Sequence, residues 1–232
     1  MRNNAFLHGA QATRTPRTLA GAAASRMALA LGCLVSMLWL ASPVLAHSTG
    51  TKAPPPAYTP AHESLAGFGV GNYALGGEFT LTGPGGKPVS LHQFTGRVVI
   101  LFFGYTHCDD ECPTTVSQIA QVQKRLGAQA GRVQPLFITI DPARDTPARL
   151  QQWLGKFGGH MLGLTGSEAD IQRVAEAYQT RFQKGQPVKG GYDIDHTLFV
   201  YLLDGHGKVR YLFPYDVQPA LLLQGAMALL HG

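Results

Sequence analysis

The chain has 232 residues, of which 45% are hydrophobic, and a formal net charge of +5. This length suits one folded domain with attached segments, and the hydrophobic content excludes an intrinsically disordered chain. Before His47 there are four arginines and no acidic residue, which leaves 15 basic and 14 acidic side chains from His47 onward. Because the excess positive charge lies at the N-terminus and no basic run follows it, the charge predicts no nucleic-acid partner.

The N-terminal segment 1–46 has the pattern of an export signal. Arg26 is followed by the apolar stretch 27–46, in which Val44 and Ala46 occupy the −3 and −1 positions before a cleavage site. The same stretch is long enough to remain uncleaved as an inner-membrane anchor. Both alternatives place the rest of the chain in the periplasm, either soluble or tethered to the periplasmic face of the inner membrane.

A proline-rich tether and a β-hairpin are expected next. Residues 47–66 contain Pro54–Pro56 and few large apolar side chains, which favours an extended tether. The folded domain is expected to cover residues 67–232. It begins with an alternating segment at Glu78–Thr82 that resumes at Val89–Leu91 after a glycine-rich turn, and this pattern predicts an antiparallel hairpin.

Strands and helices then alternate along the domain. Continuous apolar runs predict buried strands, and apolar residues at helical spacing predict helices. The predicted strands are Val98–Phe103, Gln134–Ile140, Thr197–Leu203 and Val209–Phe213, and the predicted helices begin at Pro113, Pro147, Ser167 and Leu221. This order predicts an α/β domain with a mixed central sheet flanked by helices and an N-terminal β-hairpin extension, which fits the thioredoxin fold.

Two cysteines lie between the first buried strand and the helix that follows it. Cys108 and Cys112 are four residues apart, so their side chains are about one helical turn from each other. That spacing suits either a disulfide or two sulfur ligands of one metal ion. A helix N-terminus favours thiolate, so both thiols are expected to ionise more readily than usual, although the three acids at 109–111 oppose this.

A third ligand is expected from the segment around His196. In a thioredoxin fold the chain entering the strand after His196 lies against the cysteine segment, which makes this histidine a candidate ligand. Two soft sulfurs and one imidazole suit copper, whereas zinc requires a fourth firm ligand. The residues alone favour a strand histidine satisfied by hydrogen bonds over a metal ligand. Asp195 is expected either to orient His196 as a second-shell partner or to cap the loop.

Three motifs in order resemble the Sco/SenC family of copper proteins. They are Cys108–Pro113 after Gly-Tyr-Thr-His, the acidic Asp141–Pro147 stretch, and Asp195–Thr197. The resemblance covers roughly 67–232. It implies that Cys108, Cys112 and His196 bind one copper ion, as Cu(I) or Cu(II), and that the protein helps build the copper A centre of cytochrome c oxidase. The implied partners are the copper A subunit and other periplasmic copper carriers or thiol reductants.

A second class of function uses the same fold. The cysteine pair could serve a thiol–disulfide oxidoreductase or a copper-dependent redox sensor, and it could reduce the cysteines of an oxidase target. The usual Cys-x-x-Cys motif of thioredoxins is absent from the sequence. The polar stretch with Asp141, Arg144 and Asp145 is expected to form a loop held by turn and cap interactions.

Overall fold

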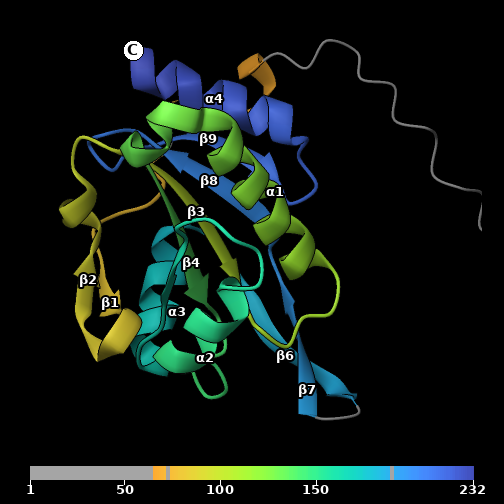
Figure 1. Ribbon diagram of the computed structural model, residues 1–232. Helices are drawn as coiled ribbons and strands as arrows, with labels where there is room; N and C mark the ends of the chain where they lie inside the picture. Colours follow the sequence, from red (N-terminus) through yellow and green to blue (C-terminus); the bar gives the residue numbers. More distant parts are fainter. Residues whose placement is uncertain (1–64, 72–73, 189–190) are drawn as a thin grey trace, which may run out of the picture. The chain divides into compact units, whose positions relative to one another are not determined.

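The computed structural model describes residues 65–71, 74–188 and 191–232 (Figure 1). The predicted leader 1–46 and nearly all of the predicted tether 47–66 lie outside these residues. Within the described part of the chain, no helix is both long enough and apolar enough to cross a bilayer.

A five-stranded mixed sheet forms the centre of the domain. Its spatial order is β5-β4-β3-β8-β9, with β3 and β4 parallel, β4 and β5 parallel, and the other two pairs antiparallel. The strands are β3 (Val98–Gly104), β4 (Val133–Thr139), β5 (Leu162–Leu164), β8 (Phe199–Leu203) and β9 (Val209–Pro214). Every residue of β3 and β4 is buried, as their continuous apolar sequences predict.

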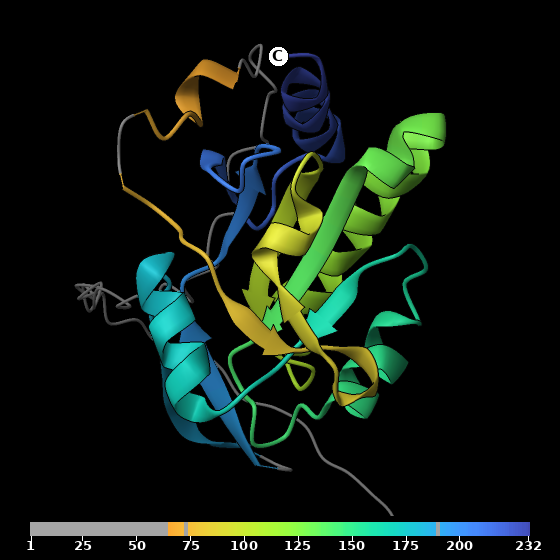
Figure 2. The same ribbon diagram turned by 90° about the vertical axis from the view of Figure 1, so that its left-hand side faces the viewer.

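Helices cover both faces of this sheet (Figure 2). They are α1 (Glu111–Leu126), α2 (Pro147–Leu154), α3 (Glu168–Ala177) and α4 (Pro219–His231), with short 3-10 turns at Leu65–Gly67, Pro84–Gly86, Leu91–Phe94 and Gly127–Arg132. One face carries Phe102 and Phe137, which pack toward α1 and α2, and the opposite face carries Phe103, which packs against Tyr178 at the end of α3. The predicted flanked mixed sheet is therefore confirmed.

The predicted N-terminal hairpin is present as β1 (Thr80–Thr82) and β2 (Pro88–Ser90), paired antiparallel. Thr82 also exchanges backbone hydrogen bonds with Thr165, which fastens the hairpin to the sheet domain. The helix start predicted at Ser167 is also confirmed, because Ser167 caps α3 and its hydroxyl accepts from the backbone N–H of Asp170 at 3.1 Å.

A second hairpin, β6 (Phe182–Val188) with β7 (Gly191–His196), was not predicted. It projects from the lower right of the domain in Figure 1. His196 was expected at the start of the strand Thr197–Leu203, but it is the last residue of β7. The sequence of β6 is polar and contains Pro187, so it carries none of the apolar alternation that marks a strand, and its pairing depends on contact with β7.

Candidate metal centre

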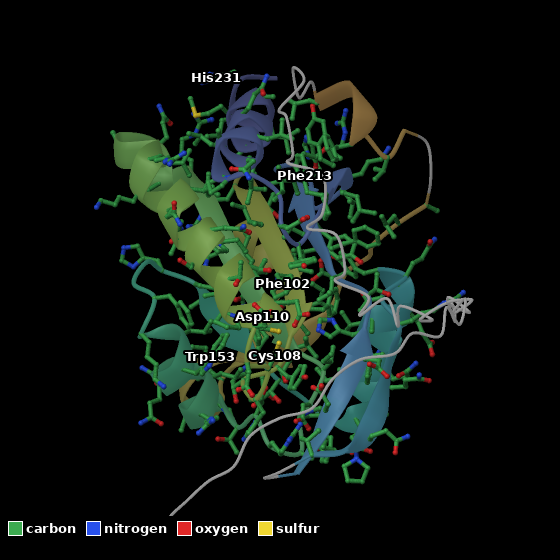
Figure 3. All side chains as sticks on the ribbon, turned by 90° about the vertical axis from the view of Figure 1, so that its right-hand side faces the viewer. Phe102, Cys108, Asp110, Trp153, Phe213 and His231 are labelled. Carbon is green, nitrogen blue, oxygen red and sulfur yellow. The ribbon has the colours of Figure 1, made fainter. Side chains whose placement is uncertain are left out.

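The cysteine segment leaves the carboxyl end of the central strand β3 and enters α1. Cys108 is 8% exposed and Cys112 is fully buried, and both are free thiols. Figure 3 labels Cys108 and Asp110 close to the start of α1. The Asp110 side chain makes no capping bond to this helix. Instead the Cys108 sulfur, two residues before the N-cap Asp110, accepts from the backbone N–H of Cys112 at 3.4 Å and so satisfies one free N–H at the helix start.

The two thiols have opposite acidities. A hydrogen bond from the Cys112 thiol, supported by backbone N–H groups, lowers the pKa of Cys108 to about 7, against the opposing effect of burial. The same hydrogen bond and burial raise the pKa of Cys112 well above its usual value. The expectation that both thiols ionise more readily is therefore confirmed for Cys108 and wrong for Cys112. Cys112 is the donor of the pair and lies in an apolar site.

We expect alkylation of the metal-free, reduced protein by iodoacetamide to select Cys108. Thiolate is the reactive form, so the rate should rise with pH and level off above a midpoint near 7, while buried Cys112 remains unmodified. Peptide mass spectrometry at a series of pH values measures this. In Cys112→Ala the Cys108 midpoint should move upward, because the thiol donor is lost. A wild-type midpoint at 8.5 or above would contradict the assigned asymmetry.

Gly104 provides the space for the Cys112 sulfur. A Cβ atom at this position would lie 2.8 Å from Cys112 Sγ and 3.0 Å from the rings of Phe102 and Phe137. Contacts this short are not tolerated without displacement of the packed rings or the sulfur. The glycine before Tyr105 is therefore required by packing, and it sets how deeply Cys112 is buried.

His196 is the last residue of β7, and one of its ring nitrogens is hydrogen-bonded to the backbone. Its Nδ1 lies 2.9 Å from the carbonyl oxygen of Thr197, which can only accept, so Nδ1 carries the proton and Nε2 keeps its lone pair. Burial lowers the pKa of His196, which keeps the imidazole neutral at neutral pH. A neutral ring with a free Nε2 is the form that binds a metal ion.

His196 approaches the cysteine segment through Tyr105, whose ring centroid lies 6.0 Å from that of His196. Among the described residues, no three His, Cys, Asp or Glu side chains lie close enough together to hold a metal ion. The structure thus pairs the two cysteines and places His196 nearby, and its role as third ligand stays a prediction. Asp195 lies next to His196 on the same strand, where successive side chains point to opposite faces. The partner that orients the imidazole is the Thr197 carbonyl, and a role for Asp195 in orienting His196 also stays a prediction.

The acidic stretch after β4 forms the predicted turn and also makes hydrogen bonds to the cysteine segment. The turn is present, since the backbone N–H groups of Arg144 and Asp145 donate to the Asp141 carbonyl. In addition, the fully buried Asp145 carboxylate accepts from the Thr106 backbone N–H at 3.0 Å, the Thr106 hydroxyl at 2.6 Å and the Thr139 hydroxyl at 2.7 Å. These bonds fix the chain two residues before Cys108.

Two tyrosines tie the β6–β7 hairpin to the same region. Tyr105 donates from its hydroxyl to the Asp193 carboxylate. Tyr192 donates to Asp141 at 2.7 Å, and the guanidinium of Arg144 lies 3.7 Å from the centre of the Tyr192 ring. Neither contact was predicted, because the hairpin itself was not. The one sequence signal for these contacts was the position of Tyr105, three residues before Cys108.

Comparison with known proteins identifies the relatives of this domain. The SCO1/SenC family model matches residues 70–231. The mitochondrial protein SCO2 of Saccharomyces cerevisiae is 38% identical over 149 residues, which are 63% of this chain and 50% of the yeast protein. A SCO2-like protein of Rickettsia conorii is 32% identical over 155 residues, covering 66% of this chain and 76% of that protein.

Solved structures agree with these sequence relatives. The structure of Bradyrhizobium japonicum ScoI with copper bound has a TM-score of 0.63 and 36% identity, and the match covers 67% of this chain and 99% of that one. Yeast Sco1 with copper bound has a TM-score of 0.61 and 31% identity, covering 67% and 88%. The predicted thioredoxin-like fold is confirmed. With most of its length matched by the family model, the chain belongs to the SCO1/SenC family.

Proposed function

We propose that this protein is a copper metallochaperone that binds one copper ion through Cys108, Cys112 and His196 and delivers it to the copper A centre of cytochrome c oxidase. The observation that carries the proposal is the asymmetric thiol pair at the end of β3. Cys108 has a pKa of about 7, so it is largely available as thiolate at neutral pH. Cys112 keeps its proton until an ion displaces it, since a metal competes with protons for thiolate.

The donor set favours copper over harder ions. Two sulfurs and one neutral imidazole are soft to intermediate ligands, which suit Cu(I) as a trigonal site and Cu(II) with one further weak ligand. The relatives described as copper-bound are Sco proteins of similar fold. Because the proposed function is to deliver copper, the site must be able to release its ion, and a three-ligand site does this more readily than a fully coordinated one.

Location and domain boundaries form part of the same proposal. Residues 1–46 would direct export or anchor the chain, 47–66 would act as the tether, and 67–232 would carry the copper site in the periplasm. The copper A subunit of the oxidase, other copper carriers and thiol reductants would be the partners. The match covers half the length of the yeast relative, so that relative by itself does not carry its activity over to this chain. Delivery to the oxidase is proposed from family membership and the donor set together.

One observation favours thiol–disulfide exchange as the second candidate function. A thiolate-forming Cys108 beside a protonated, buried Cys112 is also the arrangement of an attacking and a resolving thiol. The two functions are compatible, because a disulfide offers no thiolate and would switch copper binding off. They are separated by measuring disulfide reductase turnover beside copper stoichiometry.

We expect the reduced protein to bind one copper ion per chain and the Cys108–Cys112 disulfide form to bind none tightly. Titration with Cu(I) against a chromophoric chelator measures the stoichiometry, and reduction of the oxidised sample should restore it. Disulfide reductase turnover should be negligible. Rapid turnover together with undiminished copper binding by the oxidised form would exclude the metallochaperone assignment and favour the second candidate.

A further inference from the structure

Tyr105 contacts two of the three proposed ligand residues, Cys108 and His196, from different parts of its structure. Its backbone carbonyl accepts from the Cys108 N–H at 3.4 Å. Its ring meets the His196 ring nearly edge-on, at an interplanar angle of 78°. Tyr105 is only 2% exposed, so these contacts are made in a packed site.

The hydroxyl of Tyr105 extends these contacts to the middle of β7. It donates to the Asp193 carboxylate and accepts from the Ile194 backbone N–H at 3.3 Å. Asp193 Oδ1 accepts from the same N–H at 3.0 Å, so the three groups form a closed cluster. Ile194 is buried and lies two residues before His196. The cluster therefore holds β7 against the cysteine segment directly upstream of the histidine.

A hairpin of this kind needs such a connection. Most positions of β6 are exposed, and β6 and β7 pair only with each other among the described strands. A two-stranded hairpin is marginally stable by itself in water. The second connection, from Tyr192 to Asp141, joins the hairpin to the loop after β4 and not to the cysteine segment.

We propose that Tyr105 is a positioning residue whose hydroxyl, through Asp193, holds β7 so that His196 stays within a short movement of Cys108 and Cys112. This inference rests on the proposed copper site and names the residue that connects the histidine on β7 to the two cysteines. With the hairpin held, closing His196 onto the ion requires only a local shift. Without the hydroxyl, β7 is held less firmly against the cysteine segment, and ordering it on binding costs part of the binding free energy, which weakens the site.

The test compares Tyr105→Phe with Tyr178→Phe in the full chain. Both substitutions keep the ring and remove one hydroxyl, and Tyr178 donates to the Gly77 carbonyl at 3.1 Å, away from the hairpin. Tyr105→Phe should release Cu(II) to a chelator at least roughly tenfold faster, because it loses a hydrogen bond to a charged group, and a tenfold change corresponds to about 1.4 kcal/mol. Tyr178→Phe should leave the release rate unchanged, although its melting temperature falls.

A double-mutant cycle with Asp193→Ala isolates the contact. Tyr105→Phe should have little further effect once the carboxylate is gone, and Asp193→Asn, which keeps a carbonyl acceptor, should restore much of the wild-type rate. Additive effects, slower release in Tyr105→Phe, or equal effects in the two Phe variants would overturn the proposal.

Amide hydrogen exchange in the metal-free protein gives a readout that does not depend on copper. Tyr105→Phe should accelerate exchange along 191–196, whereas Tyr178→Phe should not. Unchanged exchange in Tyr105→Phe would overturn the positioning role even if copper binds. If the wild-type chain binds no copper but Tyr105→Phe still accelerates exchange along 191–196, the connection to β7 is supported and the failure lies in the proposed function.

Discussion

Replacing either Cys108 or Cys112 with alanine is expected to abolish tight copper binding. Each variant keeps one sulfur and one imidazole, which is too few soft donors for a trigonal site. The loss in affinity should exceed the roughly 10–100-fold that removal of an outer-shell partner costs a metal site. Competition with a chromophoric Cu(I) chelator measures it in the reduced protein.

Cys33→Ala in the leader is the matched control, because it makes the same chemical change outside the domain. The two site variants should differ in stability, since Cys112 is fully buried and its truncation leaves a void, whereas Cys108 lies at the edge of the site. Denaturant unfolding of the metal-free proteins separates this effect from metal loss. Undiminished binding in either folded variant would remove that cysteine from the site.

His196→Ala is expected to remove the thiolate-to-Cu(II) charge-transfer absorption while leaving residual Cu(I) binding. Cu(I) is soft and tolerates two thiolates alone, whereas Cu(II) needs nitrogen or oxygen donors to complete its coordination. The variant should also fail to restore oxidase activity in cells that lack the wild-type protein. A visible spectrum of each Cu(II)-loaded protein and an oxidase assay in each strain measure the two effects.

His206→Ala is the control for this substitution, because His206 is exposed in the turn between β8 and β9. It should leave spectrum and oxidase activity unchanged. An unaltered spectrum in His196→Ala would exclude the imidazole as a ligand and make His107 and the acids at 109–111 the next candidates. An altered spectrum with normal oxidase activity would retain the ligand but argue against Cu(II) as the delivered form.

The asymmetry of the thiols and the placement of His196 together suggest an order of events. Cys108 presents a thiolate at the edge of the site, with Cys112 protonated beneath it. His196 ends β7 beside the Tyr105 ring, with its Nδ1 bonded to the Thr197 carbonyl and Nε2 free. An incoming ion would therefore meet Cys108 first, then displace the Cys112 proton, and recruit the imidazole last. Release to a partner would reverse these steps.

The sequence by itself determined the elements whose signals are local. Continuous apolar runs identified β3 and β4, since strands buried on both faces have no polar side to interrupt them. Helical spacing identified α3, with its start at Ser167. The spacing of Cys108 and Cys112 was enough to place both sulfurs at one helix start, because that geometry depends on only a few residues of chain.

Only the tertiary structure decided the features that depend on distant contacts. The β6–β7 hairpin has a polar sequence and acquires its form through pairing, so His196 could not be assigned to β7 beforehand. The difference in acidity between the two thiols depends on which sulfur is buried and which one receives the hydrogen bonds. Asp145 and Tyr105 bond to groups 39 and 88 residues away in the chain. Side-chain bonds across such separations leave no periodic signal, because folding alone brings their partners together.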